Sequence, residues 1–123
     1  MFLIDTSSWI ESLRVRGDAA VRNRVRDHVL NGTAAWCEMI RLELWNGALG
    51  EQERRDLRQL ESVVYNAEID QETWAKSFDL ASLARGKGLN ASAADLLIVA
   101  TASRHKMDID YADKHIELLL KLL

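Results

Sequence analysis

An aspartate lies inside one of the most apolar stretches of the chain, ADLLIVATA at residues 94–102. If this stretch is a helix, its 3.6-residue period puts Asp95 on one face with three apolar side chains. These are Ile98, Val99 and Ala102. Burying a lone carboxylate costs several kcal/mol or forces it to take up a proton. We therefore expect a cation or a cluster of polar partners close to Asp95.

Three further carboxylates occupy comparable positions. Glu43 shares a helical stripe with the apolar residues Trp36, Met39 and Ile40. Asp5 follows the apolar run 2–4, and Asp113 follows the alternating pattern of residues 107–111. Open parallel sheets hold their ligand sites at the carboxyl ends of strands, so all four carboxylates can meet at one edge.

Helix capping is the competing explanation for two of these residues. Asp5 is followed by Thr6-Ser7-Ser8 and can serve as the N-cap of a helix. Ser92 precedes Asp95 by the spacing of a capping box, although that motif prefers Glu or Gln at its fourth position. The residues alone leave both explanations open.

Carboxylates brought together in this way need a counterion. Two unit charges about 4 Å apart repel by roughly 1 kcal/mol in water and by about 4 kcal/mol at an effective dielectric constant of 20. A divalent cation removes this repulsion, and ligands that are all oxygen favour Mg²⁺ or Mn²⁺. The three histidines are too scattered for a zinc site. The chemistry that fits is metal-assisted hydrolysis of a phosphodiester.

The elements that must position these residues alternate between strand and helix, which favours an α/β fold with a parallel sheet and right-handed crossovers. We expect a single domain over residues 1–123. The predicted strands are residues 2–4, 33–37, 63–65 together with Ile69, and 107–111. Among the predicted helices are residues 19–30, 51–61 and 114–123, and others that follow Asp5, Asp70 and Ser92.

Composition excludes several classes of protein. The net charge of -3 argues against a generally basic nucleic-acid binder, although local basic clusters or bound cations could still allow binding. The single cysteine, Cys37, excludes an internal disulfide and fits a reducing compartment. No apolar run approaches the roughly 20 residues of a membrane span, and residues 1–5 do not read as a signal peptide. We expect a soluble cytoplasmic protein with no membrane partner.

Four segments in this order resemble the PIN domain: FLIDTSSWI, IRLELWNGA, SAADLLIVATA and DYADKHI. Within that superfamily the length and the Asp-Thr-Ser start are most similar to VapC, the ribonuclease toxin of VapBC toxin–antitoxin pairs. The resemblance implies a three-layer α/β/α fold with a central parallel sheet of four to five short strands.

The resemblance also implies an activity, namely an endoribonuclease that depends on Mg²⁺ or Mn²⁺, cuts RNA and restrains translation. It makes Glu43 the residue that positions or activates water, and Ser7 and Thr6 supporting residues. It further implies a homodimer and a VapB-like antitoxin whose C-terminal segment enters the active-site groove. By the same resemblance the acidic quartet is Asp5, Glu43, Asp95 and Asp113, with Asp5, Asp95 and Asp113 as metal ligands.

The chain departs from the family pattern in two features. Tyr111 stands where many members have Thr, which makes Asp110 an alternative to Asp113, and the ending IELLLKLL shows no clear fifth strand. An inactive PIN-like module that binds RNA or protein is therefore the second hypothesis. A phosphorylated receiver domain ranks low, because no pair of adjacent acids follows the first strand. Arg14, Arg104 and Lys106 are candidates for RNA contact, with a solvated surface as the competing interpretation.

Overall fold

The computed structural model describes residues 1–123 and contains one sheet of four parallel strands. The strands are β1 (Phe2–Ile4), β2 (Ala34–Trp36), β3 (Tyr65–Asn66) and β4 (Asp108–Asp110), in the spatial order β3-β2-β1-β4. The inner strands β1 and β2 are largely buried, as expected for a parallel sheet covered by helices.

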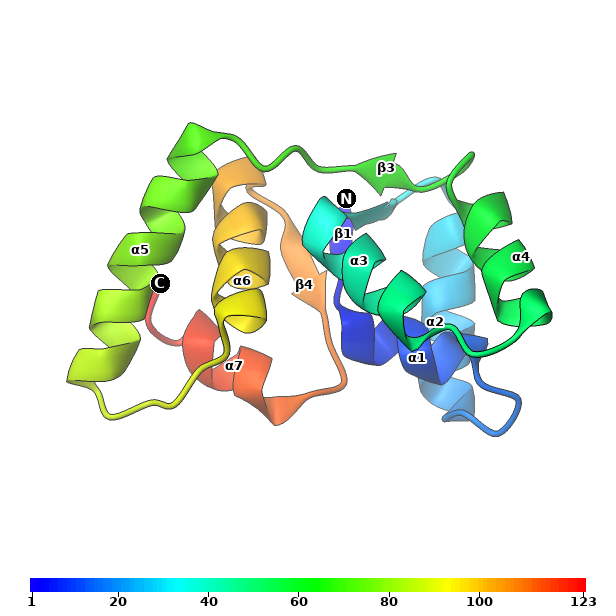
Figure 1. Ribbon diagram of the computed structural model, residues 1–123, viewed down its shortest axis with the longest axis horizontal. Helices are drawn as coiled ribbons and strands as arrows, with labels where there is room; N and C mark the ends of the chain where they lie inside the picture. The colour runs from blue at the N-terminus through cyan, green and yellow to red at the C-terminus, as the bar shows by residue number, and fades with distance from the viewer.

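Seven helices flank the sheet, so the expected α/β/α arrangement is confirmed, with four strands. Figure 1 shows α5, α6 and α7 together at one end of the molecule and α1, α2 and α4 at the other, with β1 and β4 between them. The helices are α1 (Thr6–Leu13), α2 (Ala19–Leu30), α3 (Glu38–Gly47), α4 (Glu51–Leu60), α5 (Gln71–Gly86), α6 (Ala93–His105) and α7 (Lys114–Leu120).

The winding of the sheet brings two strand ends together. The chain adds β2 and then β3 on one side of β1, and later places β4 on the other side. Strands β1 and β4 pair in parallel with Ile4 opposite Asp110, so the residues after both strands leave the sheet at the same edge. In open α/β sheets ligands bind at such a reversal of strand order, outside the carboxyl ends of the strands.

Helix α6 is buried on almost all sides from Leu97 to Ala102. It lies between two apolar clusters, because Ile98 belongs to the cluster that includes Trp9 and Trp36, and Val99 belongs to a smaller cluster with residues of α5 and α7. A helix that is apolar all round is typical of such a central position. This packing fixes the direction in which the first turn of α6 presents Asp95.

The predicted strands 33–37 and 107–111 and the predicted helix 51–61 differ from the structure by one residue at one or both ends, and two further elements differ by more. The third strand was predicted at residues 63–65 with Ile69, but β3 comprises only Tyr65 and Asn66, because the turn after α4 continues to residue 63. The final helix was predicted to reach residue 123 and ends at Leu120. No helix has both the length and the apolar character that crossing a membrane would require.

Candidate active site

Asp5 follows β1 directly, where it caps α1 and also lies close to Asp95. Its side chain caps α1, since Oδ2 accepts hydrogen bonds from the Ser7 N–H at 3.3 Å and from the Ser7 hydroxyl at 2.6 Å. The residue is only 3% exposed. Burial raises the pKa of Asp5, the bonds from Ser7 oppose this, and the negative charge of Asp95 raises it further. The capping explanation is thus correct, but capping leaves the carboxylate within reach of a second acid.

Glu43 approaches Asp5 from α3. Its Oε1 accepts a hydrogen bond from the Thr6 hydroxyl at 2.7 Å, which ties α3 to the first residue of α1. Burial raises the pKa of Glu43, the bond from Thr6 opposes this, and the charges of Asp5 and Asp95 raise it further. The carboxylates of Asp5, Glu43 and Asp95 therefore share one region, as the sequence predicted.

Asp95 lies in the first turn of α6, where its N–H donates to the Ser92 hydroxyl at 3.0 Å. Burial raises the pKa of Asp95, a hydrogen bond with Ser92 opposes it, the charge of Asp113 raises it and His115 lowers it. Asp113 caps α7, and its Oδ1 lies 3.0 Å from Nδ1 of His115. Asp113, three residues after the end of β4, is thus close enough for its charge to act on Asp95.

The protein supplies little positive charge to this acidic group. No Lys or Arg forms a salt bridge with Asp5, Glu43 or Asp95. Acidic oxygens that are partly buried, mutually repelling and unpaired suit a hard divalent cation such as Mg²⁺.

The side chains do not, however, form a complete set of metal ligands. No group of three His, Cys, Asp or Glu residues is arranged to hold one metal ion. The predicted set of Asp5, Asp95 and Asp113 is therefore not assembled around a single point. Mg²⁺ is commonly held by one or two carboxylates, with water and substrate phosphate filling its other positions. The residues fit an ion bound in that manner.

Asp110, the alternative to Asp113, is engaged elsewhere. Its carboxylate accepts hydrogen bonds from Nε and Nη2 of Arg24 at 2.6 and 2.8 Å, and from the Ser8 hydroxyl at 2.8 Å. A carboxylate that is neutralised by arginine has little to offer a metal ion, so the geometry favours Asp113 as the fourth acid. Nothing in the sequence linked residues 24 and 110.

The two supporting residues each orient one acid. The Thr6 hydroxyl holds Glu43. The Ser7 hydroxyl donates to Asp5 and also accepts the Ala112 N–H at 3.0 Å, which connects the start of α1 to the segment after β4.

The three basic candidates lie apart from the acidic group. Arg14 follows the end of α1 and pairs with Glu11 at 3.4 Å. Arg104 is in the last turn of α6, a helix of 13 residues that spans about 20 Å, whereas Asp95 is in its first turn. Arg104 pairs there with Asp70 at 3.0 Å, and Lys106 ends the same helix in a left-handed conformation. The structure brings neither Arg104 nor Lys106 to the carboxylates.

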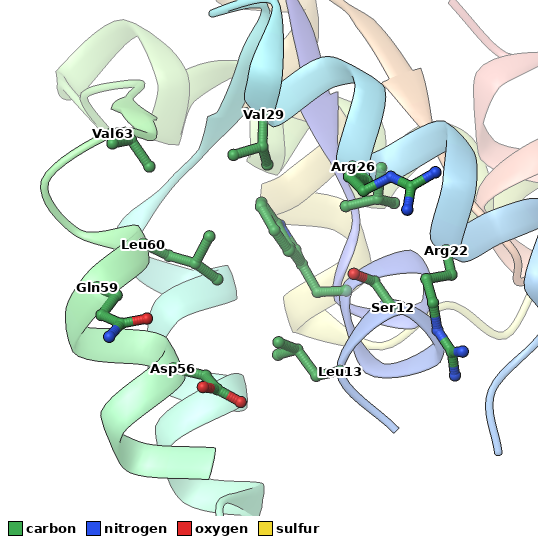
Figure 2. A pocket seen from close by; sticks show the side chains of 11 residues that line it. Ser12, Leu13, Arg22, Arg26, Val29, Asp56, Gln59, Leu60 and Val63 are labelled. Atoms are coloured by element: carbon green, nitrogen blue, oxygen red, sulfur yellow. The ribbon is translucent and has the colours of Figure 1, made fainter. Parts of the chain in front are cut away.

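A cavity of about 710 Å³ lies elsewhere, between α1, α2 and α4. In Figure 2, Arg22, Arg26 and Val29 of α2 face Asp56, Gln59 and Leu60 of α4 across it. None of the four clustered carboxylates lines this cavity. Six of its eleven lining residues are apolar, and Asp56 is the single carboxylate among them, so we place the candidate active site at the acidic group.

Comparison with known proteins identifies the family of the chain. The family model described as PIN domain matches residues 2–119. The chain is 29% identical over 127 residues to the VapC ribonuclease Mb1587 of Mycobacterium bovis, covering 99% of this chain and 93% of the relative. The same values hold for Ribonuclease VapC11 of Mycobacterium tuberculosis.

Solved structures share the fold. VapBC-1 from nontypeable Haemophilus influenzae superposes with a TM-score of 0.78 at 17% identity, covering 99% of this chain and 93% of that one. FitAcB from Neisseria gonorrhoeae superposes with a TM-score of 0.73 at 22% identity, with coverage of 98% and 94%. Because the family model spans β1 through most of α7, this chain belongs to the PIN domain family.

Proposed function

We propose that this chain, acting as one domain over residues 1–123, is an endoribonuclease that hydrolyses RNA phosphodiester bonds with the help of Mg²⁺ or Mn²⁺. The observation that carries the proposal is the group of carboxylates at the reversal of strand order, with no Lys or Arg paired to Asp5, Glu43 or Asp95. The ribonuclease names of its relatives support RNA as the substrate.

The acidic residues would have different roles in this reaction. Asp5 and Asp95 would hold the metal ion, with water and the nearby Asp113 completing its surroundings, and Ser7 keeps the Asp5 carboxylate in place. When bound, such an ion acts as a Lewis acid: it would orient the scissile phosphate, offset its developing negative charge and lower the pKa of bound water. Glu43 is oriented by Thr6, and its raised pKa makes it a better proton acceptor for the attacking water.

The proposal includes the biological setting. Solved neighbours include VapBC and FitAB complexes, two of them bound to DNA, which supports a role as the toxin of a type II toxin–antitoxin pair. Its partners would be RNA, a VapB-like antitoxin and a second copy of the chain in a homodimer. Cleavage of RNA would restrain translation, and a cytoplasmic location goes with that target.

Cleavage of a labelled RNA, measured while Mg²⁺ or Mn²⁺ is titrated, tests the proposal. We expect metal-dependent cleavage by the wild type, and a fall in kcat of about 10²- to 10³-fold in both Asp5→Asn and Asp95→Asn, because each loses a carboxylate that would hold the ion. The control is Glu38→Gln, an exposed carboxylate on α3 that pairs with Arg41. Unchanged cleavage in both aspartate variants would mean that the site is wrong or that another nuclease is present.

A PIN-like module that binds RNA or protein without cutting is the second candidate. The lack of three converging metal ligands favours it. Retention of bound RNA with no product at saturating Mn²⁺, under conditions in which the chain is folded, would select this candidate over the ribonuclease.

A further inference from the structure

An ion pair between a buried carboxylate and a half-exposed arginine lies next to the acidic site. Asp110 ends β4 and is only 6% exposed, and its carboxylate faces the guanidinium of Arg24 through two hydrogen bonds. The fully buried Ser8 donates a third hydrogen bond, and Nε2 of His28 lies 3.6 Å from Oδ2. All these partners come from α1 and α2, so Asp110 connects the end of β4 to the two helices that follow β1.

The same short segment is attached to the Asp5 region at two further points. The carbonyl oxygen of Asp110 accepts the Asp5 N–H at 2.8 Å. The Ala112 N–H donates to the Ser7 hydroxyl, which in turn donates to the Asp5 carboxylate. Asp113 comes next in the chain. The position of Asp113 relative to Asp5 therefore depends on how residues 110–112 are held.

We infer that the Arg24–Asp110 pair positions the acidic site, by fixing the end of β4 and hence the spacing between the Asp5 and Asp113 carboxylates. This inference rests on the proposed function and extends it, because it gives two residues outside the group of four acids a role in arranging the site.

Two physical features support a positioning role. The two-pronged contact of a guanidinium with a carboxylate restricts orientation as well as distance, which a single-point contact does not. An intact ion pair, whether exposed or buried, commonly adds little net stability compared with apolar packing of similar volume, which is compatible with a positioning role for this one. Residues that orient metal ligands from behind commonly change metal affinity or activity by 10- to 100-fold when they are replaced.

The first test is Mn²⁺ affinity, measured by electron paramagnetic resonance on the complete chain in the absence of RNA. In Asp110→Asn the amide oxygen can still accept from Ser8, but the charge opposite Arg24 is lost. We expect Mn²⁺ binding to weaken about tenfold and kcat for RNA to fall similarly, with KM nearly unchanged. Asp70→Asn is the matched control, because Asp70 also caps a helix and pairs with an arginine, at the far end of α6. It should leave Mn²⁺ affinity unchanged.

A second series of variants replaces Arg24, in case Asp110→Asn does not fold. Arg24 is partly exposed, with 45% of its side chain accessible, so its replacement is accommodated more easily than that of Asp110. Arg24→Gln should weaken Mn²⁺ binding about tenfold, and Arg24→Lys, which keeps the charge but loses the fork, should recover part of the loss. Circular dichroism at the assay temperature confirms that each variant is folded.

The outcomes separate this inference from the proposed function. Wild-type Mn²⁺ affinity in folded Asp110→Asn or Arg24→Gln overturns the inference, whether or not RNA is cut. Equal weakening in Asp70→Asn also overturns it, because the effect would then reflect lost stability. Mn²⁺ binding that depends on Arg24 and Asp110 without RNA cleavage supports the inference and overturns the proposed function. A wild-type chain that binds no Mn²⁺ overturns both.

Discussion

At the scale of single residues, short polar side chains hold the acids of this site in place. Thr6 and Ser7 are consecutive, and each donates a hydroxyl hydrogen bond to a different acid, Glu43 and Asp5. These bonds oppose the rise in pKa that burial causes, so they keep part of the negative charge available in a partly buried position. The site is therefore under electrostatic strain in the free protein, and that strain has a measurable consequence for stability.

Replacing Glu43 with Gln should stabilise the fold at neutral pH. The pKa of Glu43 is raised from its ordinary value of 4.5, so the folded state binds its proton more tightly than the unfolded chain does. Its contribution to stability is then highest at low pH and falls as the pH rises through the window from 4.5 to the folded pKa. With solvent screening allowed for, we expect Glu43→Gln to raise the free energy of unfolding at pH 7 by a few tenths to about 1 kcal/mol.

Urea unfolding at pH 7 and at pH 4 checks this prediction, since the gain should shrink at pH 4, where Glu43 is largely protonated in the folded state. Glu38→Gln on the same helix is the control. Its carboxylate accepts a hydrogen bond from Arg41, so its loss should not stabilise the fold. A destabilised Glu43→Gln at pH 7 would contradict the electrostatic argument.

At the scale of elements, the site depends on how tightly the connections hold the helices. The loop between α1 and α2 is the clearest case, because the backbone of Gly17 approaches that of α1. A Cβ added to Gly17 would lie 1.8 Å from the carbonyl oxygen of Glu11. By contrast, a Cβ added to Gly47, the last residue of α3, would have no neighbour within 4 Å.

Alanine at these two positions should therefore have opposite effects. Gly17→Ala forces the loop away from α1 and should lower the free energy of unfolding by about 1–3 kcal/mol. Gly47→Ala should raise it by about 0.4–1 kcal/mol, because alanine restricts the unfolded chain and favours helix. Thermal and urea unfolding of both variants measure the difference. Equal effects would show that the loop does not pack as closely as described.

At the scale of the whole molecule, the topology concentrates negative charge at one edge of the sheet. Strands β1 and β4 end there side by side, α3 and α6 approach with Glu43 and Asp95, and no Lys or Arg pairs with either residue. A cation that binds the folded protein and not the unfolded chain must then stabilise the whole domain.

Mg²⁺ or Mn²⁺ should accordingly raise the midpoint of thermal unfolding. At about one hundred times Kd, binding adds about 2.7 kcal/mol, which for a chain of 123 residues corresponds to a rise of about 10 °C. Differential scanning fluorimetry with and without a chelator measures this rise. In Asp5→Asn it should be much smaller, and a rise of equal size there would place the stabilising ion elsewhere.

The α/β fold class could be predicted from the sequence alone, and so could the acids that we propose for the site. Strand ends are readable from short apolar runs such as Phe2–Ile4, and Glu43 and Asp95 stood out because charged residues are rare on apolar helix stripes. In α6, however, the apolar stripe that contains Asp95 says little about which face is buried, because residues 97–102 are buried on every face of the helix.

It took the packed fold to show that Asp110 is engaged by Arg24, which favours Asp113 as the fourth acid, and that Arg104 lies at the far end of α6 from Asp95. Both findings depend on contacts between residues far apart in the chain, such as the pairing of Arg24 with Asp110 and of Arg104 with Asp70. Local periodicity reports which face of an element is buried, but not which charge from another element lies opposite it. That pairing is fixed only when the strands and helices pack together.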